Sequence, residues 1–428
     1  MTRLRIMLGA DTYPPDLNGA ARFTEQLAYG LAGRGHAVHV LCPSLTGSPE
    51  WRSGGGVREH RLTSRRTPAH PTFRICLPWQ VSAAVADHAR VLAPDVVHVQ
   101  SHFAVGRTLI DAAVSRGVPV VATNHFMPEN LLGHAHVPGF LHRPVARRAW
   151  RDLGNVFRRA QVVTAPSPRA VQLLAEAAGV SGAVPVSCGI DLDRFSPSGA
   201  VPDVPTVLFV GRLDREKRVD ELLRAVAALP AEPQVRVEIV GDGSRRHHLE
   251  LLTDLLGIRS RVRFLGAVDE AELVAAYARC SVFCMPGVAE LQSLATMEAM
   301  ASGAPVVAAD AMALPHLVRP GITGWLYPPG DVGALTTRLA TLLVDPGLCR
   351  RMGAAGRELV TAHAADRTLD AFESLYTEVL HRGAGRQVPV EHLASSRELI
   401  RRAGTGSVKM SRWPSTCSTS LRWSGPGG

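Results

Sequence analysis

Apolar strand-like runs alternate with amphipathic helical segments over most of the chain, and this alternation restricts the fold more than any other feature. Residues 4–9 form a short apolar run, a helical pattern covers 20–34, and a second apolar run follows at 37–42. Runs of the same kind recur at 95–100, 119–123 and 162–165. Apolar strands with helices between them predict a parallel sheet covered on both faces.

The alternation stops at a proline-rich stretch, residues 197–205, and begins again after it. The later apolar runs are TVLFV, VRVEIV, VRFLG, SVFCM and PVVAA. Two successive α/β halves predict two Rossmann-like domains that face each other across a cleft. We expect an N-terminal domain at 1–188, a linker at 189–205, a C-terminal domain at 206–365, a C-terminal helix at 366–381 and a disordered basic tail at 382–428.

Charge and composition exclude several classes of protein. Residues 1–200 hold 21 Lys or Arg and 13 Asp or Glu, a net charge of +8, whereas residues 201–381 hold 18 and 23, a net charge of −5. Because no basic segment is interleaved with aromatics, we expect no nucleic-acid partner. No run reaches the ~20 apolar residues of a spanning helix, and the first ten residues lack the pattern of a signal peptide. Seven scattered cysteines fit reduced core thiols, so we expect a cytoplasmic protein.

The segment after the first strand of the second half carries a candidate anion site. Arg212 and Lys217 follow the apolar run TVLFV within GRLDREKR, and Lys217 is one of only two lysines in a chain that otherwise uses arginine. A lysine just after a strand suits a phosphate as a point charge. A solvated residue in a first helical turn is an equally good interpretation of this position alone.

Two glutamates lie close together near a predicted helix start. Glu290 precedes the helix on a loop, Ser293 is a plausible N-cap, and Glu298 lies one turn into a helix that ends at Gly303. A helix N-terminus at a cleft binds anions, and carboxylates beside it can accept hydrogen bonds from sugar or ribose hydroxyls. Solvated surface glutamates are the alternative, but Glu298 is surrounded by apolar neighbours, which is a poor place for an unpaired charge.

Five segments together resemble the retaining family-4 glycosyltransferases, which have the GT-B fold. They are PPDLNGAARFTEQLAYGLAGRGHAVHV, VSCGIDLDRFSP, GRLDREKR, the Glu-x7-Glu segment followed by EAMASGAPVVA, and GITGWLYPPGD. The resemblance covers roughly residues 3–380. It implies a metal-independent hexosyltransferase without a cofactor, which moves glucose or mannose from a nucleoside-diphosphate sugar to a hydroxyl acceptor. The C-terminal domain would then bind the donor, and the N-terminal domain the acceptor.

The resemblance also implies roles for individual residues. Arg212 and Lys217 would neutralise the diphosphate of the donor, Glu290 would contact the donor sugar, and Glu298 would hold the ribose hydroxyls. Gly19 would let the backbone approach the phosphate, and His125 would lie near the reacting sugar. Without a metal, the charge on the leaving diphosphate must be met by arginine, lysine and helix N-termini. We assign Glu290 to positioning and charge stabilisation, because no side chain stands out as a covalent nucleophile.

The sequence departs from the family at the donor loop. Many members have Glu-Gly-Phe-Gly where this chain has Glu290, Leu291, Gln292 and Ser293. Backbone amides from Gln292 to Leu294 would lie beside the sugar and phosphate, so the sugar contacts are expected to differ. Asp191 and Asp193 belong to the linker pattern, and we expect no metal site there.

A basic amphipathic helix is predicted at 143–160. Its apolar stripe contains Trp150, Leu153 and Phe157, and arginines occupy most of the remaining surface. Such a helix could lie on an anionic membrane, on its inner face, which would suit a lipid or lipid-linked acceptor. A helix packed on the core with a solvated basic face is the commoner structure for this pattern.

Two other functions compete with transfer. The chain could be a catalytically silent nucleotide-sugar-binding protein, or another GT-B enzyme such as an epimerase. The full set of Gly19, His125, Arg212, Lys217 and both glutamates favours the transferase. A dehydrogenase is disfavoured because no Gly-x-Gly-x-x-Gly follows the first strand.

Overall fold

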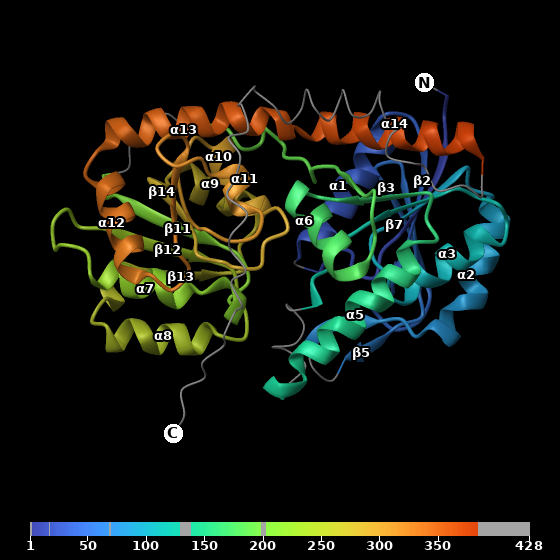
Figure 1. Cartoon of the computed structure of the whole chain (residues 1–428), viewed down its shortest axis with the longest axis horizontal. Coiled ribbons are helices and arrows are strands. Elements are labelled where there is room, and N and C mark those ends of the chain that lie inside the picture. The colour runs from blue at the N-terminus through green and yellow to red at the C-terminus, as the bar shows by residue number, and fades with distance from the viewer. Residues whose placement is uncertain (1, 17, 68–69, 129–137, 198–202, 384–428) are drawn as a thin grey trace.

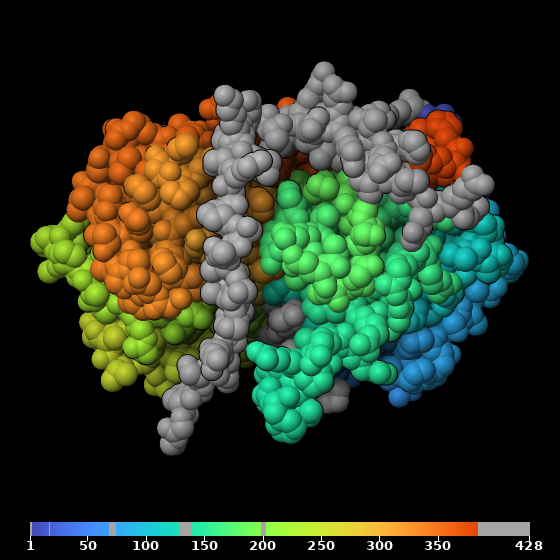
Figure 2. Space-filling view, viewed as in Figure 1, coloured from blue at the N-terminus to red at the C-terminus, as the bar shows by residue number. Residues whose placement is uncertain are grey.

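A computed structural model describes residues 2–16, 18–67, 70–128, 138–197 and 203–383 (Figure 1). Residues 384–428, nearly all of the predicted tail, lie outside this part of the chain. Two Rossmann-like sheets with helices around them form two lobes, side by side in Figure 2, as the alternation predicted.

The first sheet has the strand order β10-β9-β8-β7-β1-β2-β4-β3, and every pair is parallel except β3 with β4. Its strands are β1 (Arg5–Gly9), β2 (Ala37–Pro43), β3 (Glu50–Gly54), β4 (Val57–Leu62), β7 (Val96–Val99), β8 (Val120–Thr123), β9 (Val162–Ala165) and β10 (Val184–Pro185). A separate antiparallel pair joins β5 (Arg65–Thr67) to β6 (His70–Ile75). The helices of this half are α1 (Gly19–Gly33), α2 (Pro78–Leu92), α3 (Ala104–Val114), α5 (His142–Phe157) and α6 (Pro168–Leu173), which continues as the π-helical turn η2 (Leu174–Ala178); the short η1 (Gly139–Leu141) precedes α5.

The second sheet is parallel throughout, with the order β13-β12-β11-β14-β15-β16. Its strands are β11 (Thr206–Val210), β12 (Arg236–Val240), β13 (Val262–Gly266), β14 (Val282–Met285), β15 (Val306–Ala309) and β16 (Gly324–Tyr327). The α-helices are α7 (Val219–Ala227), α8 (Arg246–Leu255), α9 (Glu270–Ala278), α10 (Leu294–Ala301), α11 (Leu314–Leu317), α12 (Val332–Leu343), α13 (Pro346–Val360) and α14 (Ala365–Arg382). Short turns are η3 (Arg215–Lys217), η4 (Arg259–Arg261) and η5 (Thr361–His363).

The strand order of each sheet fixes where a ligand can bind. In the first sheet β1 lies between β2 and β7, and in the second β11 lies between β12 and β14, so the connections leave each of these strands in opposite directions. The loops that follow the strands separate at such a reversal and leave a crevice at the carboxyl ends of the strands. The segments after β1, β7, β11 and β14 therefore form the expected binding edges.

Helix α14 returns from the second half and packs on the first sheet (Figure 1). Phe372 and Tyr376 are buried in the same apolar cluster as the residues of β1 and α1. Tyr376 Oη lies 2.7 Å from Nδ1 of the buried His98. At the end of α1, Arg34 Nη1 contacts Asp370 and Glu373 at 2.6 Å each. Apolar burial and paired charges thus fasten the end of the chain to the first half.

Helix α5 realises the predicted basic amphipathic helix, and its second half packs on the core. Trp150, Leu153 and Phe157 are buried in the main apolar cluster of the first half. This is the commoner of the two structures considered for the helix. None of the helices in the described part of the chain is both long and apolar enough to cross a membrane.

Buried histidines make this fold sensitive to acid. Burial lowers the pKa of His98 to about 3 and that of His102 to about 4, so both rings are neutral in the folded chain. Their ordinary pKa is about 6.5, so the unfolded chain binds protons first as the pH falls. The stability gained from excluding these protons is therefore complete above pH 6.5 and is lost as the pH falls towards 4.

We accordingly expect the melting temperature to be constant between pH 7 and 8 and to fall between pH 6.5 and 4.5. His102→Phe should weaken this fall, since the ring lies among Phe103 and Phe126 at centroid distances of 4.2 and 5.1 Å. The exposed His247→Gln is the control. Thermal melts at four pH values measure the effect. A stability that rises on acidification to pH 5 would contradict it.

Candidate active site

The loop after β11 presents the two predicted phosphate ligands. Gly211 ends the strand, Arg212 follows it, and Lys217 closes the short turn η3. Arg212 lies 2.7 Å from Asp214 and 3.0 Å from Glu216, so its guanidinium is held in place by two carboxylates. The loop thus holds two cations at the carboxyl end of β11.

Lys217 and Glu290 meet across the reversal between β11 and β14. The Lys217 ammonium donates a hydrogen bond to Glu290 Oε1, and the Glu290 side chain is nearly buried. Gly287 makes this approach possible, because a Cβ there would lie 3.0 Å from that carboxylate oxygen. The backbone N–H of Val288 donates to the carbonyl of Glu216 at 3.0 Å and joins the two loops. The structure therefore brings together two residues that are 73 positions apart.

Helix α10 starts at this point, but Ser293 does not cap it in the predicted way. Ser293 occupies the N-cap position in a left-handed conformation, with φ of 75°, and its hydroxyl lies 2.8 Å from Thr296 Oγ1. In that conformation no hydrogen bond forms between the hydroxyl and a backbone N–H of the first turn. The first backbone N–H groups of α10, including that of Leu294, are therefore left without a side-chain cap at the edge of the cleft.

Glu298 is held from both halves of the chain. Its side chain is only 4% exposed; Oε2 accepts from the Tyr277 hydroxyl at 2.7 Å, and Oε1 lies 3.0 Å from Nη1 of Arg22 on α1. Burial first, and the Glu298 charge second, raise the pKa of Tyr277 well above its ordinary value. Tyr277 is thus a permanent donor to Glu298, and Arg22 supplies a cation that the sequence analysis did not identify.

The donor loop is fastened to the end of the first half. The buried Gln292 accepts a hydrogen bond from the backbone N–H of Cys188 at 2.8 Å and donates one to the Ser187 hydroxyl at 2.7 Å. The Ser167 hydroxyl also donates to the carbonyl of Leu291 at 2.5 Å. The Gln292 side chain is therefore engaged with residues 187–188, and its predicted role towards a donor would belong to its backbone.

Gly19 opens α1 and faces the start of α10. Asn18 caps α1 by accepting from the backbone N–H of Ala21 at 2.9 Å. A Cβ on Gly19 would lie 3.8 Å from Cδ1 of Leu294. The N-termini of α1 and α10 thus approach each other from opposite halves, and both carry the positive end of a helix dipole.

His125 follows β8 in the first half and is neutral. Its Nε2 lies 3.0 Å from Oε1 of Gln100, which follows β7, and its ring centroid lies 4.8 Å from that of Phe23 on α1. Burial lowers the pKa of His125 to about 4. A neutral ring that donates Nε2–H to Gln100 has Nδ1 as a hydrogen-bond acceptor.

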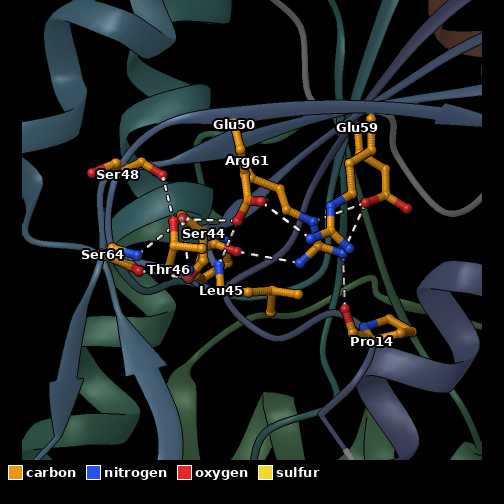
Figure 3. A network of polar contacts seen from close by, with 12 residues as sticks. Pro14, Ser44, Leu45, Thr46, Ser48, Glu50, Glu59, Arg61 and Ser64 are labelled. Atoms are coloured by element: carbon orange, nitrogen blue, oxygen red, sulfur yellow. Dashed lines mark hydrogen bonds and ion pairs between the residues drawn. The ribbon is translucent and has the colours of Figure 1, made fainter.

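The loop between β1 and α1 has a buried anchor that the sequence analysis also missed. Figure 3 shows Arg61 of β4, whose guanidinium contacts Glu59 at 2.8 Å and donates to the carbonyl of Pro14 at 2.9 Å. In the same network Glu50 accepts from the backbone N–H of Leu45. Arg61 thus supports the backbone that leads to Gly19. The alternating string VREHRL gives no sign that this arginine points inward.

Asp191 and Asp193 are used by the chain itself. Asp191 accepts from the backbone N–H of Asp193 at 3.1 Å and of Arg194 at 2.9 Å, which stabilises a turn in the linker. Among the described residues, no group of three or more His, Cys, Asp or Glu side chains is arranged to hold a metal ion.

Comparison with known proteins agrees with this geometry. The model named Glycosyltransferase Family 4 matches residues 17–194, and the model named Glycosyl transferases group 1 matches residues 193–359. The chain is 33% identical over 347 residues to a GDP-mannose-dependent alpha-mannosyltransferase of Mycobacterium tuberculosis, with 77% of this chain and 85% of the relative covered. It is 31% identical to a phosphatidyl-myo-inositol mannosyltransferase of Mycobacterium leprae, covering 85% and 94%.

Solved structures share the fold. A sucrose-phosphate synthase of Thermosynechococcus elongatus superposes with a TM-score of 0.74 at 23% identity, covering 88% of this chain and 99% of that one. The HepE protein of Anabaena, solved with UDP and glucose, gives a TM-score of 0.71 at 20% identity, covering 88% and 100%. Together with the matches in sequence, these likenesses identify the chain as a member of the family-4 glycosyltransferases with the GT-B fold.

Proposed function

We propose that this glycosyltransferase moves a mannosyl group from GDP-mannose to a hydroxyl of a lipid or lipid-linked glycan, with retention of anomeric configuration and without a metal ion. The observation that carries the proposal is the pairing of Lys217 with Glu290 beside the uncapped start of α10. It lies at a strand-order reversal, where α/β sheets receive ligands. The names of the similar mannosyltransferases support GDP-mannose as donor and a phosphatidylinositol-like acceptor.

The donor diphosphate would lie between the cations and the two helix N-termini. Lys217 and Arg212 would neutralise the charge that grows on the diphosphate as the sugar leaves, and the N–H groups of α10 would contribute fixed dipoles. Glu298, beneath these groups on α10, would accept the ribose hydroxyls. These contacts strengthen as charge develops, and such contacts accelerate the transfer step itself.

Transfer with retention would place the acceptor on the same face of the sugar as the leaving diphosphate. The bond from C1 to the diphosphate oxygen breaks, the bond from C1 to the acceptor oxygen forms, and the acceptor proton goes to the departing diphosphate. Glu290, held by Lys217, would stabilise positive charge on the sugar ring. The neutral His125 would accept a hydrogen bond from a sugar hydroxyl through Nδ1.

A donor panel tests this function. We expect the full-length protein, in the presence of EDTA and phosphatidylinositol vesicles, to consume GDP-mannose and release GDP faster than it consumes UDP-glucose or ADP-glucose. The isolated product should contain an α-linked mannosyl group. Donor binding without turnover on any acceptor would instead support the silent binding protein, and epimerised nucleotide sugar would support the epimerase.

The amino end of α5 favours an acceptor in a membrane. We name Phe140, Leu141, Val145, Arg147 and Arg148 the α5 tip; all five side chains are exposed, and Phe140 is 82% exposed. Aromatic and aliphatic groups beside arginines suit the interface of an anionic bilayer. In the cell this tip would contact the inner face of the membrane.

Variants of the α5 tip should separate membrane contact from chemistry. Each arginine near an anionic surface contributes roughly 1 kcal/mol. Replacing Arg147 and Arg148 with glutamate should therefore weaken binding to phosphatidylglycerol vesicles by at least about tenfold, while transfer to a water-soluble acceptor is unchanged. Trp51→Ser, at a residue that is 64% exposed on β3, is the apolar control. Equal binding of all variants, or equal binding to neutral vesicles, would remove the electrostatic part of the proposal.

A further inference from the structure

One ion pair in the cleft joins the two halves at the carboxylate proposed to hold the ribose. Arg22 lies three residues after Gly19 on α1, and Glu298 lies four residues after Leu294 on α10. Since residues three and four apart share a helix face, the two ion-pair partners and the two helix starts face each other. The Arg22 Nη1 to Glu298 Oε1 distance is 3.0 Å.

Arg22 covers the carboxylate. The Glu298 side chain is 4% exposed whereas that of Arg22 is 30% exposed, so the guanidinium lies between the carboxylate and solvent. Tyr277 occupies the other carboxylate oxygen from inside the second half. The Tyr277 ring is buried and part of the core, so it cannot move without disrupting the packing. A ribose hydroxyl can therefore reach Glu298 only if Arg22 leaves it.

Resting on the proposed function, we propose that Arg22 is a gate for the donor. In the ligand-free chain it neutralises Glu298. On donor binding, the ribose hydroxyls replace the guanidinium at Glu298, and Arg22 turns towards the diphosphate between the starts of α1 and α10. The ribose and the diphosphate would then be recognised together, because the cation freed by one is used by the other.

The pairing of charges in the empty site supports this exchange. Lys217 is paired with Glu290, and Arg212 with Asp214 and Glu216, so every cation that we assign to the donor has a carboxylate partner before the donor arrives. Arg22 differs because its partner belongs to the opposite half. Moving this arginine from carboxylate to phosphate would exchange one charge-assisted pair for another, at little cost in desolvation.

The exchange predicts opposite effects on two ligands. Calorimetry at pH 8 should show that Arg22→Ala binds GDP about tenfold more weakly than the wild type, because a phosphate cation is lost. The same variant should bind guanosine severalfold more tightly, because the ribose no longer competes with a guanidinium. Arg22→Lys keeps the charge and should bind GDP within about threefold of the wild type. Arg3→Ala, at an exposed residue of the first half, controls for the change in net charge.

Two further variants separate failure of the gate from failure of the site. Glu298→Gln should weaken guanosine binding if this carboxylate holds the ribose, and Lys217→Ala should weaken GDP binding alone. If both do so but Arg22→Ala weakens guanosine and GDP equally, or changes neither, the gate is wrong while the donor site stands. If the wild type binds no nucleotide, the proposed function fails. Thermal melts of each variant show whether the fold is retained.

Discussion

Lys217→Ala is expected to lower the rate of sugar transfer at saturating donor by roughly 10²- to 10³-fold, the usual loss when one preorganised charge is removed from a developing anion. Lys217 ends a rigid turn after β11 and is fixed by Glu290, so its charge is in place before the reaction starts. Single-turnover measurements with GDP-mannose would report the transfer step directly. A loss confined to KM would mean that the ammonium binds the donor and its transition state equally.

The control for this prediction must separate charge from stability. Lys217→Ala also leaves the nearly buried Glu290 carboxylate without its cation, which costs folding free energy. Lys217→Arg keeps the charge and should retain measurable transfer, while Lys217→Ala/Glu290→Gln removes the unpaired carboxylate and should restore the melting temperature but not the rate. A single alanine variant that transfers within threefold of the wild type would contradict the assignment of Lys217.

The central strands of both sheets could be predicted because they are apolar along their whole length. Buried parallel strands such as β8 leave no ambiguity in the pattern, and the proline-rich linker marked the point where the second sheet begins. The edge strands could not be predicted in this way. Strand β3, with the sequence EWRSG, is exposed on most positions and pairs only with β4, so its sequence carries no apolar period.

The donor loop was predictable for a different reason. Lys217 is conspicuous by its rarity, and Glu290 and Glu298 are close in sequence, so local reasoning could connect them. Arg22 is one of many arginines, and its partner is 276 positions away, so only the three-dimensional structure reveals it. The engagement of Gln292 with Ser187 has the same origin. Contacts between the halves depend on how the two domains face each other, and no periodicity records that.

The largest expected effect outside the charged residues belongs to Gly241, which follows β12. Its φ is +124°, and a Cβ there would lie 2.0 Å from the carbonyl oxygen of Gly211, the residue that opens the loop of Arg212 and Lys217. The two backbones are also linked, because the N–H of Gly211 donates to the carbonyl of Val240 at 3.0 Å. Gly241→Ala must therefore push the phosphate loop away. We expect a loss of unfolding free energy of roughly 2–4 kcal/mol, from backbone strain and overpacking together.

A second glycine separates the strain from the displacement. Gly257 also has a positive φ, +68°, but no atom lies within 4 Å of a Cβ placed there. Gly257→Ala should thus cost only the left-handed backbone, about 1 kcal/mol, and leave GDP binding unchanged. Gly241→Ala should cost more and also weaken GDP binding at least about tenfold, since a displacement near 1 Å of positioned groups has effects of that order or larger. Denaturant unfolding and calorimetry on the two variants measure both quantities. If Gly241→Ala resembled Gly257→Ala in both, the contact between Gly241 and Gly211 would not be what holds the phosphate loop in position.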